Sequence, residues 1–113
     1  MNDLKTKGQL GEQLAQERYL ARGYQLKAKN FTIRGGEIDL VMQKADELVF
    51  VEVKVVDGIQ DWTSYLSARK FQALERSIEA YCFREGWEES VRLDVVFIAR
   101  GKVLEVYENV SNN

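Results

Sequence analysis

Four charged residues stand in pairs within apolar stretches of the 113-residue chain, and their types and spacing suit metal-assisted chemistry. One residue separates Glu37 from Asp39, and one residue separates Glu52 from Lys54. Side chains two positions apart on a strand point to the same face. Charges are rarely placed in segments that a sheet buries unless they have a partner or a purpose. Three converging carboxylates and an amine could bind a hard divalent cation and support phosphodiester hydrolysis.

Converging carboxylates would need a cation for electrostatic reasons. At about 4 Å and an effective dielectric constant near 20, two carboxylates repel each other by roughly 4 kcal/mol. A small domain is stable by only ~5–15 kcal/mol, so this repulsion has to be offset. Lys54 would offset a part, and Mg²⁺ or Mn²⁺ in an all-oxygen site would offset the rest. The alternative is an exposed sheet face on which Glu52 and Lys54 form cross-strand ion pairs with Asp39.

The charged pairs lie in two predicted strands, residues 37–42 and residues 48–56, the second of which is dense in Val and Phe. Alternation puts Glu37 and Asp39 on one face of the first strand and Ile38 and Leu40 on the other face. In the second strand, one face carries Phe50, Glu52 and Lys54, and the other face carries Val49, Val51, Val53 and Val55. An antiparallel hairpin is the simplest connection. With an even loop such as Ala45-Asp46, Asp39 lies opposite Glu52 on the same face. With an odd loop the two carboxylates point to opposite faces unless a bulge intervenes.

A helix is expected over residues 3–22, before these strands. Asn2 or Asp3 is its expected N-cap, and Gly23 is its expected stop. One narrow stripe of this helix would let it approach a sheet closely, and it consists of Leu4, Gly8, Gly11, Ala15 and Tyr19. Glu12 lies at the border of this stripe, so its carboxylate is expected to lie near the sheet.

A second helix is expected after a loop at residues 57–63. Thr63 or Ser64 caps it, it extends to about Arg84, and Gly86 ends it. Three further strands are expected at residues 24–29, 91–99 and 102–107, the last two joined by a tight turn at Arg100-Gly101.

The predicted order is therefore α-β-β-β-α-β-β, in one α/β domain of residues 1–113 with a frayed tail at residues 110–113. A mixed central sheet begins as an antiparallel meander and carries the two helices. A right-handed crossover through the second helix would place strand 91–99 parallel to strand 48–56.

Composition excludes several classes of protein. The chain contains no His, which excludes Ser-His-Asp hydrolases, Cys-His proteases and His-ligated zinc sites. Its single Cys82 cannot form an internal disulfide, which favours a cytoplasmic location. No apolar run approaches the ~20 residues of a membrane span. Residues 1–36 carry seven basic and three acidic side chains, so a basic face could meet phosphates.

The run GGEIDLV, followed by VFVEVK, resembles the G-E-x-D…E-V-K core of the PD-(D/E)XK nuclease superfamily. More closely, the sequence resembles the small YraN-type predicted endonucleases, which are distantly similar to archaeal Holliday-junction resolvases. Further matching features are Gly11-Glu12 with Ala15, Tyr24, Asn30-Phe31, Lys70 and Arg92-Leu93-Asp94-Val95-Val96. The resemblance covers about residues 8–98.

This resemblance implies a restriction-endonuclease-like fold and a Mg²⁺ or Mn²⁺ site. Asp39 and Glu52 would be the metal ligands, completed by the backbone carbonyl of Val53. Lys54 would be the catalytic lysine. Glu12 would be a helix-borne carboxylate that reaches the site, directly or through water.

The resemblance also implies accessory and substrate-binding residues. Glu37 would be an auxiliary acid in the catalytic set. Contacts to nucleic acid are expected from the basic residues Lys27, Lys29, Arg34 and Lys70. The chain departs from the family pattern after E-V-K, where Val55, Val56 and Asp57 replace the usual polar and basic residues. This departure weakens the expected affinity for nucleic acid.

The expected activity is metal-dependent hydrolysis of DNA phosphodiester bonds in branched or single-stranded DNA, recognised by structure rather than by sequence. The main alternative is a catalytically weak or inactive nuclease-fold adaptor that binds nucleic acid or a protein partner. A purely structural α/β module with an ion-paired sheet face is the third possibility. A homodimer or a protein partner fits the first two, and no membrane is expected.

Overall fold

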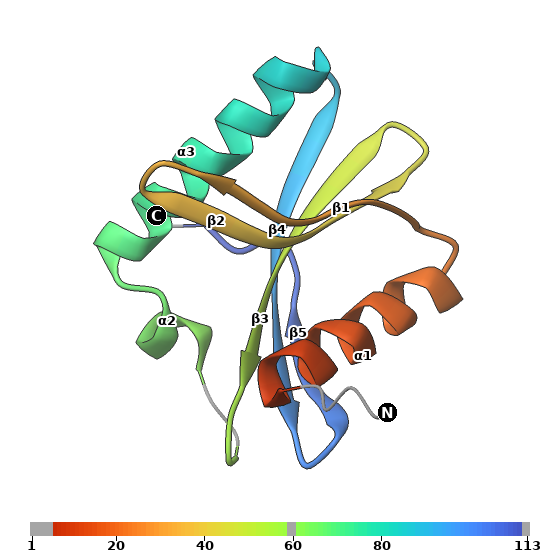
Figure 1. Cartoon of the computed structure of the whole chain (residues 1–113), viewed down its shortest axis with the longest axis vertical. Coiled ribbons are helices and arrows are strands. Elements are labelled where there is room, and N and C mark those ends of the chain that lie inside the picture. The colour runs from red at the N-terminus through yellow and green to blue at the C-terminus, as the bar shows by residue number, and fades with distance from the viewer. Residues whose placement is uncertain (1–5, 59–60, 112–113) are drawn as a thin grey trace, which may run out of the picture.

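A computed structural model describes residues 6–58 and 61–111 and shows one mixed sheet with helices on both of its faces (Figure 1). The elements are α1 (Lys7–Ala21), β1 (Gln25–Ile33), β2 (Gly36–Lys44), β3 (Glu47–Val55), α2 (Trp62–Tyr65), α3 (Ala68–Glu85), β4 (Ser90–Ala99) and β5 (Lys102–Tyr107). The predicted α/β class and element order are confirmed, with the short α2 as an addition. No helix in the described residues is long and apolar enough to cross a membrane.

The sheet has the strand order β1-β2-β3-β4-β5. Neighbouring strands are antiparallel except β3 and β4, which run parallel from Glu47↔Ser90 to Val55↔Ile98. A parallel pair needs a crossover connection, and the segment with α2 and α3 supplies it. The predicted parallel pairing of these two strands is therefore confirmed.

Two hydrophobic cores lie on opposite faces of the sheet. The core under α1 contains Ala15, Tyr19, Leu40, Met42, Val49, Val51, Val96 and Ile98. The core under α3 includes Ile38, Val41, Leu48, Phe50, Phe71, Leu74, Tyr81, Leu93, Val95 and Phe97. Because β3 contributes to both cores, its sequence is nearly continuous in apolar residues, as for a strand buried on both faces.

Helix α1 begins four residues later than predicted, because Thr6 is its N-cap. The Thr6 hydroxyl accepts a hydrogen bond from the backbone N–H of Gln9 at 3.1 Å, and the Gln9 side chain accepts one from the N–H of Thr6 at 2.9 Å. This reciprocal capping box satisfies two helix donors at once. The predicted caps Asn2 and Asp3 lie outside the described residues. Gly23, with φ of +90°, follows the end of the helix as predicted.

The predicted second helix is divided in two, so its expected start at Thr63 or Ser64 is wrong. Asp61 caps α2 by accepting a hydrogen bond from the N–H of Thr63 at 3.0 Å. Ser67 caps α3, after an extended residue has interrupted the helical backbone. Gly86 ends α3 in the left-handed conformation, with φ of +66°, as predicted.

Both predicted hairpins are confirmed. Ala45 and Asp46 form the loop between Lys44 and its partner Glu47, so the loop has even length. Continuing this register places Asp39 next to Glu52 across the strand pair. Arg100-Gly101 connects β4 to β5, and both turn residues have a positive φ, as the favoured two-residue turns require.

Candidate functional site

The two strands that carry the acidic motif separate where the motif lies. Pairing between β2 and β3 extends only to Leu40↔Val51, after which β2 continues beside β1 and β3 continues beside β4 (Figure 1). The hairpin therefore opens into a fork. At the base of the fork, the backbone N–H of Val53 donates a 2.7 Å hydrogen bond to Oδ2 of Asp39. The carboxylate of Asp39 thus replaces a backbone partner at the point where the ladder ends.

A break in strand alternation aims Asp39 into this fork. Ile38 packs in the core under α3, whereas Leu40 packs in the core under α1. The prediction that these two residues share a face is therefore wrong. Asn30, which faces Asp39 in the β1–β2 register, has a left-handed φ of 52°, a conformation that Asn tolerates better than most residues. The break in alternation leaves the Asp39 side chain within hydrogen-bond reach of the β3 backbone.

Glu52 is the second carboxylate at the fork and is buried, with 8% of its surface exposed. Its Oε2 accepts a hydrogen bond from the Tyr65 hydroxyl at 3.3 Å and lies 3.9 Å from the Lys70 ammonium. Its Oε1 is buried and has no hydrogen-bond partner among the described residues. A buried carboxylate oxygen without a donor is costly, so this atom points to a missing proton, water or cation.

Burial is the main influence on both carboxyl groups of the pair. It raises the pKa of Asp39, which the hydrogen bond from Val53 and the charge of Lys70 lower again in part. Burial, followed by the neighbouring charge of Asp39, raises the pKa of Glu52 to about 8. The two carboxyls are close enough to share a hydrogen bond, which requires a proton on one of them. A bound cation could take the place of that proton.

Tyr65 and Lys70 bring the positive charge to this pair. The Lys70 ammonium donates a 2.6 Å hydrogen bond to the Tyr65 hydroxyl and lies 3.9 Å from the centroid of the Tyr65 ring. The ammonium of Lys54, the predicted catalytic lysine, lies 5.2 Å from the centroid of the same ring. Lys70 is thus the cation in ion-pair range of Glu52. Tyr65 was not among the predicted site residues. Its only signal in the sequence is its position between the acidic strand and Lys70.

Glu12 approaches from α1 because that helix packs very closely on β3. A Cβ at the preceding Gly11 would lie 2.9 Å from Cγ2 of Val55. Burial and then the charge of Asp39 raise the pKa of Glu12, while a hydrogen bond with Asn30 lowers it. Glu12 is therefore within electrostatic range of the carboxyl pair, as predicted for a helix-borne acid.

Glu37 does not join the pair as a third ligand. It is exposed on β2 and contributes only a small electrostatic effect, on Glu12. In the described parts of the chain, no group of three or more Asp, Glu, His or Cys side chains is arranged to hold a metal ion. The expected convergence of three carboxylates is thus reduced to Asp39 and Glu52, with Glu12 farther away.

Three of the four predicted nucleic-acid contacts lie on the β1–β2 hairpin. Lys27 and Lys29 are exposed on β1, and Arg34 is exposed in the following turn. Lys29 is close enough to lower the pKa of Glu12. Lys70 is the exception, because it is drawn inward by Tyr65 and Glu52.

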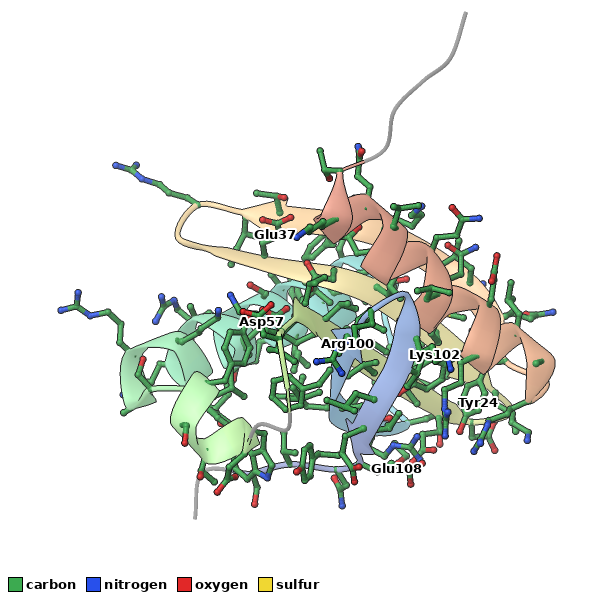
Figure 2. All side chains as sticks on the ribbon, turned by 90° about the horizontal axis from the view of Figure 1, so that it is seen from below. Tyr24, Glu37, Asp57, Arg100, Lys102 and Glu108 are labelled. Atoms are coloured by element: carbon green, nitrogen blue, oxygen red, sulfur yellow. The ribbon has the colours of Figure 1, made fainter. Side chains whose placement is uncertain are left out.

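The departure after the E-V-K motif places an exposed acid just beyond the end of β3. Figure 2 shows Asp57 just beyond β3 and Arg100 in the turn between β4 and β5. Both residues line a groove of about 480 Å³, together with Gly11 and Val55. Asp57 and Arg100 therefore bring opposite charges to the lining of one groove.

The Arg92-Asp94 motif belongs to the scaffold. Asp94 is fully buried and receives two 2.9 Å hydrogen bonds from Arg92, a 2.5 Å bond from the Tyr19 hydroxyl and a 3.0 Å bond from the N–H of Asn109. With its oxygens satisfied in this way, Asp94 connects α1 and the C-terminal segment to β4.

Comparison with known proteins identifies relatives over most of the chain. The model of a family described as "Uncharacterised protein family UPF0102" matches residues 11–98. A UPF0102 protein of Methylobacterium nodulans is 37% identical over 95 residues, which are 82% of this chain and 74% of that protein. A UPF0102 protein of Nitratiruptor sp. is 34% identical over 92% of this chain and 91% of its own length. The UPF0102 protein STH1475 of Symbiobacterium thermophilum is 41% identical over 83% and 82%, respectively.

Proposed function

We propose that this chain, which belongs to the uncharacterised protein family UPF0102, is a Mg²⁺- or Mn²⁺-dependent endonuclease of the PD-(D/E)XK superfamily that hydrolyses DNA phosphodiester bonds. One observation carries the proposal: half-buried Asp39 and buried Glu52 form a carboxyl pair at the open fork of β2 and β3, and Oε1 of Glu52 has no hydrogen-bond partner in the described chain. The restriction-endonuclease-like arrangement of strands and flanking helices supports it.

The donor set suits a hard divalent cation. Asp39 and Glu52 present carboxylate oxygens that cannot both be charged without compensation, and Mg²⁺ and Mn²⁺ prefer oxygen ligands. The carbonyl of Val53 is the expected third ligand, since its peptide adjoins the one that binds Asp39. When bound, the cation would polarise a phosphoryl oxygen and lower the pKa of a water molecule.

Side chains around the pair would supply the remaining chemistry. The ammonium groups of Lys54 and Lys70 both lie near the Tyr65 ring, where they can stabilise the negative charge that develops on a phosphate. Glu12, with its raised pKa and its hydrogen bond to Asn30, would orient water on the α1 side of the fork.

The surface charge favours branched or single-stranded DNA as the substrate. The chain has a net charge of −2, and the exposed Asp57 follows the end of β3. The exposed cations on β1, in the turn after it and on β3 are few, namely Lys27, Lys29, Arg34 and Lys54. Such a surface is not suited to long tracts of duplex, whose binding relies on many phosphate contacts.

Titration with Mn²⁺ and cleavage of a DNA panel test the proposal together. We expect wild type to bind Mn²⁺ and to cleave one or more of linear, single-stranded and four-way DNA substrates. Asp39→Asn should weaken Mn²⁺ binding by at least about 100-fold and abolish cleavage, since losing a ligand costs more than losing its supporting partner. Asp46→Asn changes the same residue type at the closed end of the same hairpin and should behave as wild type. Equal binding and cleavage by Asp39→Asn and wild type would refute the proposal.

The position of Lys54 favours a second candidate, a nuclease-fold adaptor that binds nucleic acid without cleaving it. Its ammonium is engaged above the Tyr65 ring, at 5.2 Å from the centroid, rather than placed at the carboxyl pair. The adaptor would bind DNA in a salt-dependent manner, and Lys29→Met would weaken this binding. Binding without cleavage at any Mn²⁺ concentration would select this candidate.

A further inference from the structure

Tyr65 is the residue that joins both lysines of the site to its buried carboxylate. Its hydroxyl accepts a hydrogen bond from Lys70 at 2.6 Å and donates one to Oε2 of Glu52 at 3.3 Å. The Lys70 ammonium lies 3.9 Å and the Lys54 ammonium 5.2 Å from the centroid of its ring. An edge-on contact with Phe97, at 6.1 Å between ring centroids, helps to hold the ring in place. Tyr65 therefore determines where the two charges lie.

We propose that Tyr65 holds Lys70 as an internal counter-cation for Glu52, which competes with the divalent metal for that carboxylate. In this role Tyr65 is a positioning residue, because it acts through Lys70 and not on the reacting atoms. The inference rests on the proposed function, since it presupposes that Glu52 is a metal ligand.

The geometry shows which member of the Lys70–Glu52 ion pair can move when a metal binds. Lys70 lies 3.9 Å from Oε2 of Glu52, and its side chain is 40% exposed, against 10% for Glu52. The short direct bond of Lys70 is the one to the Tyr65 hydroxyl. The ammonium can therefore turn toward solvent without opening the core, whereas the carboxylate cannot. Glu52 stays in place, and Lys70 is the mobile member of the pair.

Charge determines the direction of the effect. An ammonium beside Glu52 attracts the empty, negative site and repels a divalent cation bound to it. The effect on metal affinity has the same direction whether the carboxyl pair starts with one shared proton or with none. In both cases the site becomes more positive when the metal binds, so a nearby ammonium opposes binding. Removing the charge of Lys70 should therefore tighten metal binding, although Lys70 helps to stabilise the metal-free protein. A residue that merely supports the structure of the site would have the opposite effect or none.

Calorimetric titration with Mn²⁺ tests this competition. We expect Lys70→Met to bind Mn²⁺ about ten-fold more tightly than wild type, a modest effect because the ammonium is partly exposed. Tyr65→Phe keeps the ring and removes the hydroxyl, so it should tighten binding by a smaller factor. Lys70→Arg keeps the charge and should remain close to wild type. Lys102→Met removes an exposed lysine at the start of β5 and should leave the affinity unchanged.

Nuclear magnetic resonance of ¹⁵N-lysine-labelled protein supplies a readout without activity. In metal-free wild type, the hydrogen-bonded Lys70 ammonium should give a slowly exchanging signal that Lys70→Met identifies. Tyr65→Phe should abolish the signal, and Mg²⁺ should do the same in wild type. Wild type that binds metal with the same or greater affinity than Lys70→Met would overturn this inference alone. Wild type that binds no metal would overturn the proposed function and the inference together.

Discussion

The stability of the protein should fall as the pH rises from about 5 to about 8, because of Glu52. The pKa of its carboxyl is raised from 4.5 to about 8 in the folded protein, by burial and by Asp39. A carboxyl with a raised pKa binds its proton more tightly in the folded state than in the unfolded state. Its stabilising effect is complete below the unfolded pKa and is lost as the pH approaches the folded pKa.

The size of the effect follows from the shift. At about 1.4 kcal/mol for each pKa unit, protonation of Glu52 contributes at most about 5 kcal/mol, which is lost by about pH 8. This would be a large share of the ~5–15 kcal/mol expected for a small domain. The chain has no His, so the side chain that ordinarily titrates in this range does not obscure the effect.

Urea unfolding in the presence of EDTA, at several pH values, measures this loss. Glu52→Gln is a neutral isostere of the protonated side chain and should match wild type near pH 5, then exceed it increasingly toward pH 8. Glu105→Gln, at an exposed position on β5, should follow the wild-type curve. A flat wild-type stability over this range, or an unchanged slope in Glu52→Gln, would refute the assignment of a buried, proton-sharing pair.

Four further predictions concern the scaffold and the metal. Gly11→Ala should lower the free energy of unfolding by roughly 1–3 kcal/mol, because its Cβ would lie 2.9 Å from a methyl group of Val55. Gly8→Ala, with its nearest neighbour atom at 3.8 Å, should instead gain about 0.5–1 kcal/mol in the same urea titration. Asp94→Asn should cost roughly 1–3 kcal/mol, as chemical denaturation would show, since the Asn amide would turn an N–H donor toward donors that now bind a carboxylate oxygen, while Arg92 keeps its ion pair with Glu47. Mn²⁺ at about 100 times its Kd should stabilise wild type by ~2.7 kcal/mol in thermal unfolding but Asp39→Asn by no more than about 0.4 kcal/mol, and equal stabilisation of both would place the cation elsewhere.

The fork explains why a hairpin of ordinary sequence can carry a pair of acids of which one, Glu52, is buried. Regular pairing beyond Leu40 would have given each backbone group a strand partner and turned the acidic side chains to the sheet faces. The left-handed Asn30 and the end of the ladder leave the N–H of Val53 free to bind Asp39. Glu52 lies on β3, which continues into the core, so it is buried. The neighbouring carboxylate of Asp39 binds the backbone of β3 where pairing with β2 has ended.

Several features of the fold could be predicted from the sequence because they depend on neighbouring residues. Apolar density identified β3 as a central strand, and the tight turn between β4 and β5 followed from Arg100-Gly101. The sequence left the parity of the other hairpin loop open, and the even alternative, with Ala45-Asp46 as its example, is the one that places Asp39 opposite Glu52. These features are determined by local backbone geometry and by the period of side chains along a strand.

Other features depend on contacts between distant segments, and only the tertiary structure decided them. Strict alternation put Ile38 and Leu40 on one face, but the left-handed backbone of Asn30 on the neighbouring strand reverses the orientation between them. The lysine next to Glu52 in space is Lys70 and not Lys54, because Tyr65 on a separate short helix binds its ammonium. Spacing along one strand can show which side chains share a face, but the ordering of charges at a site depends on how separate elements pack.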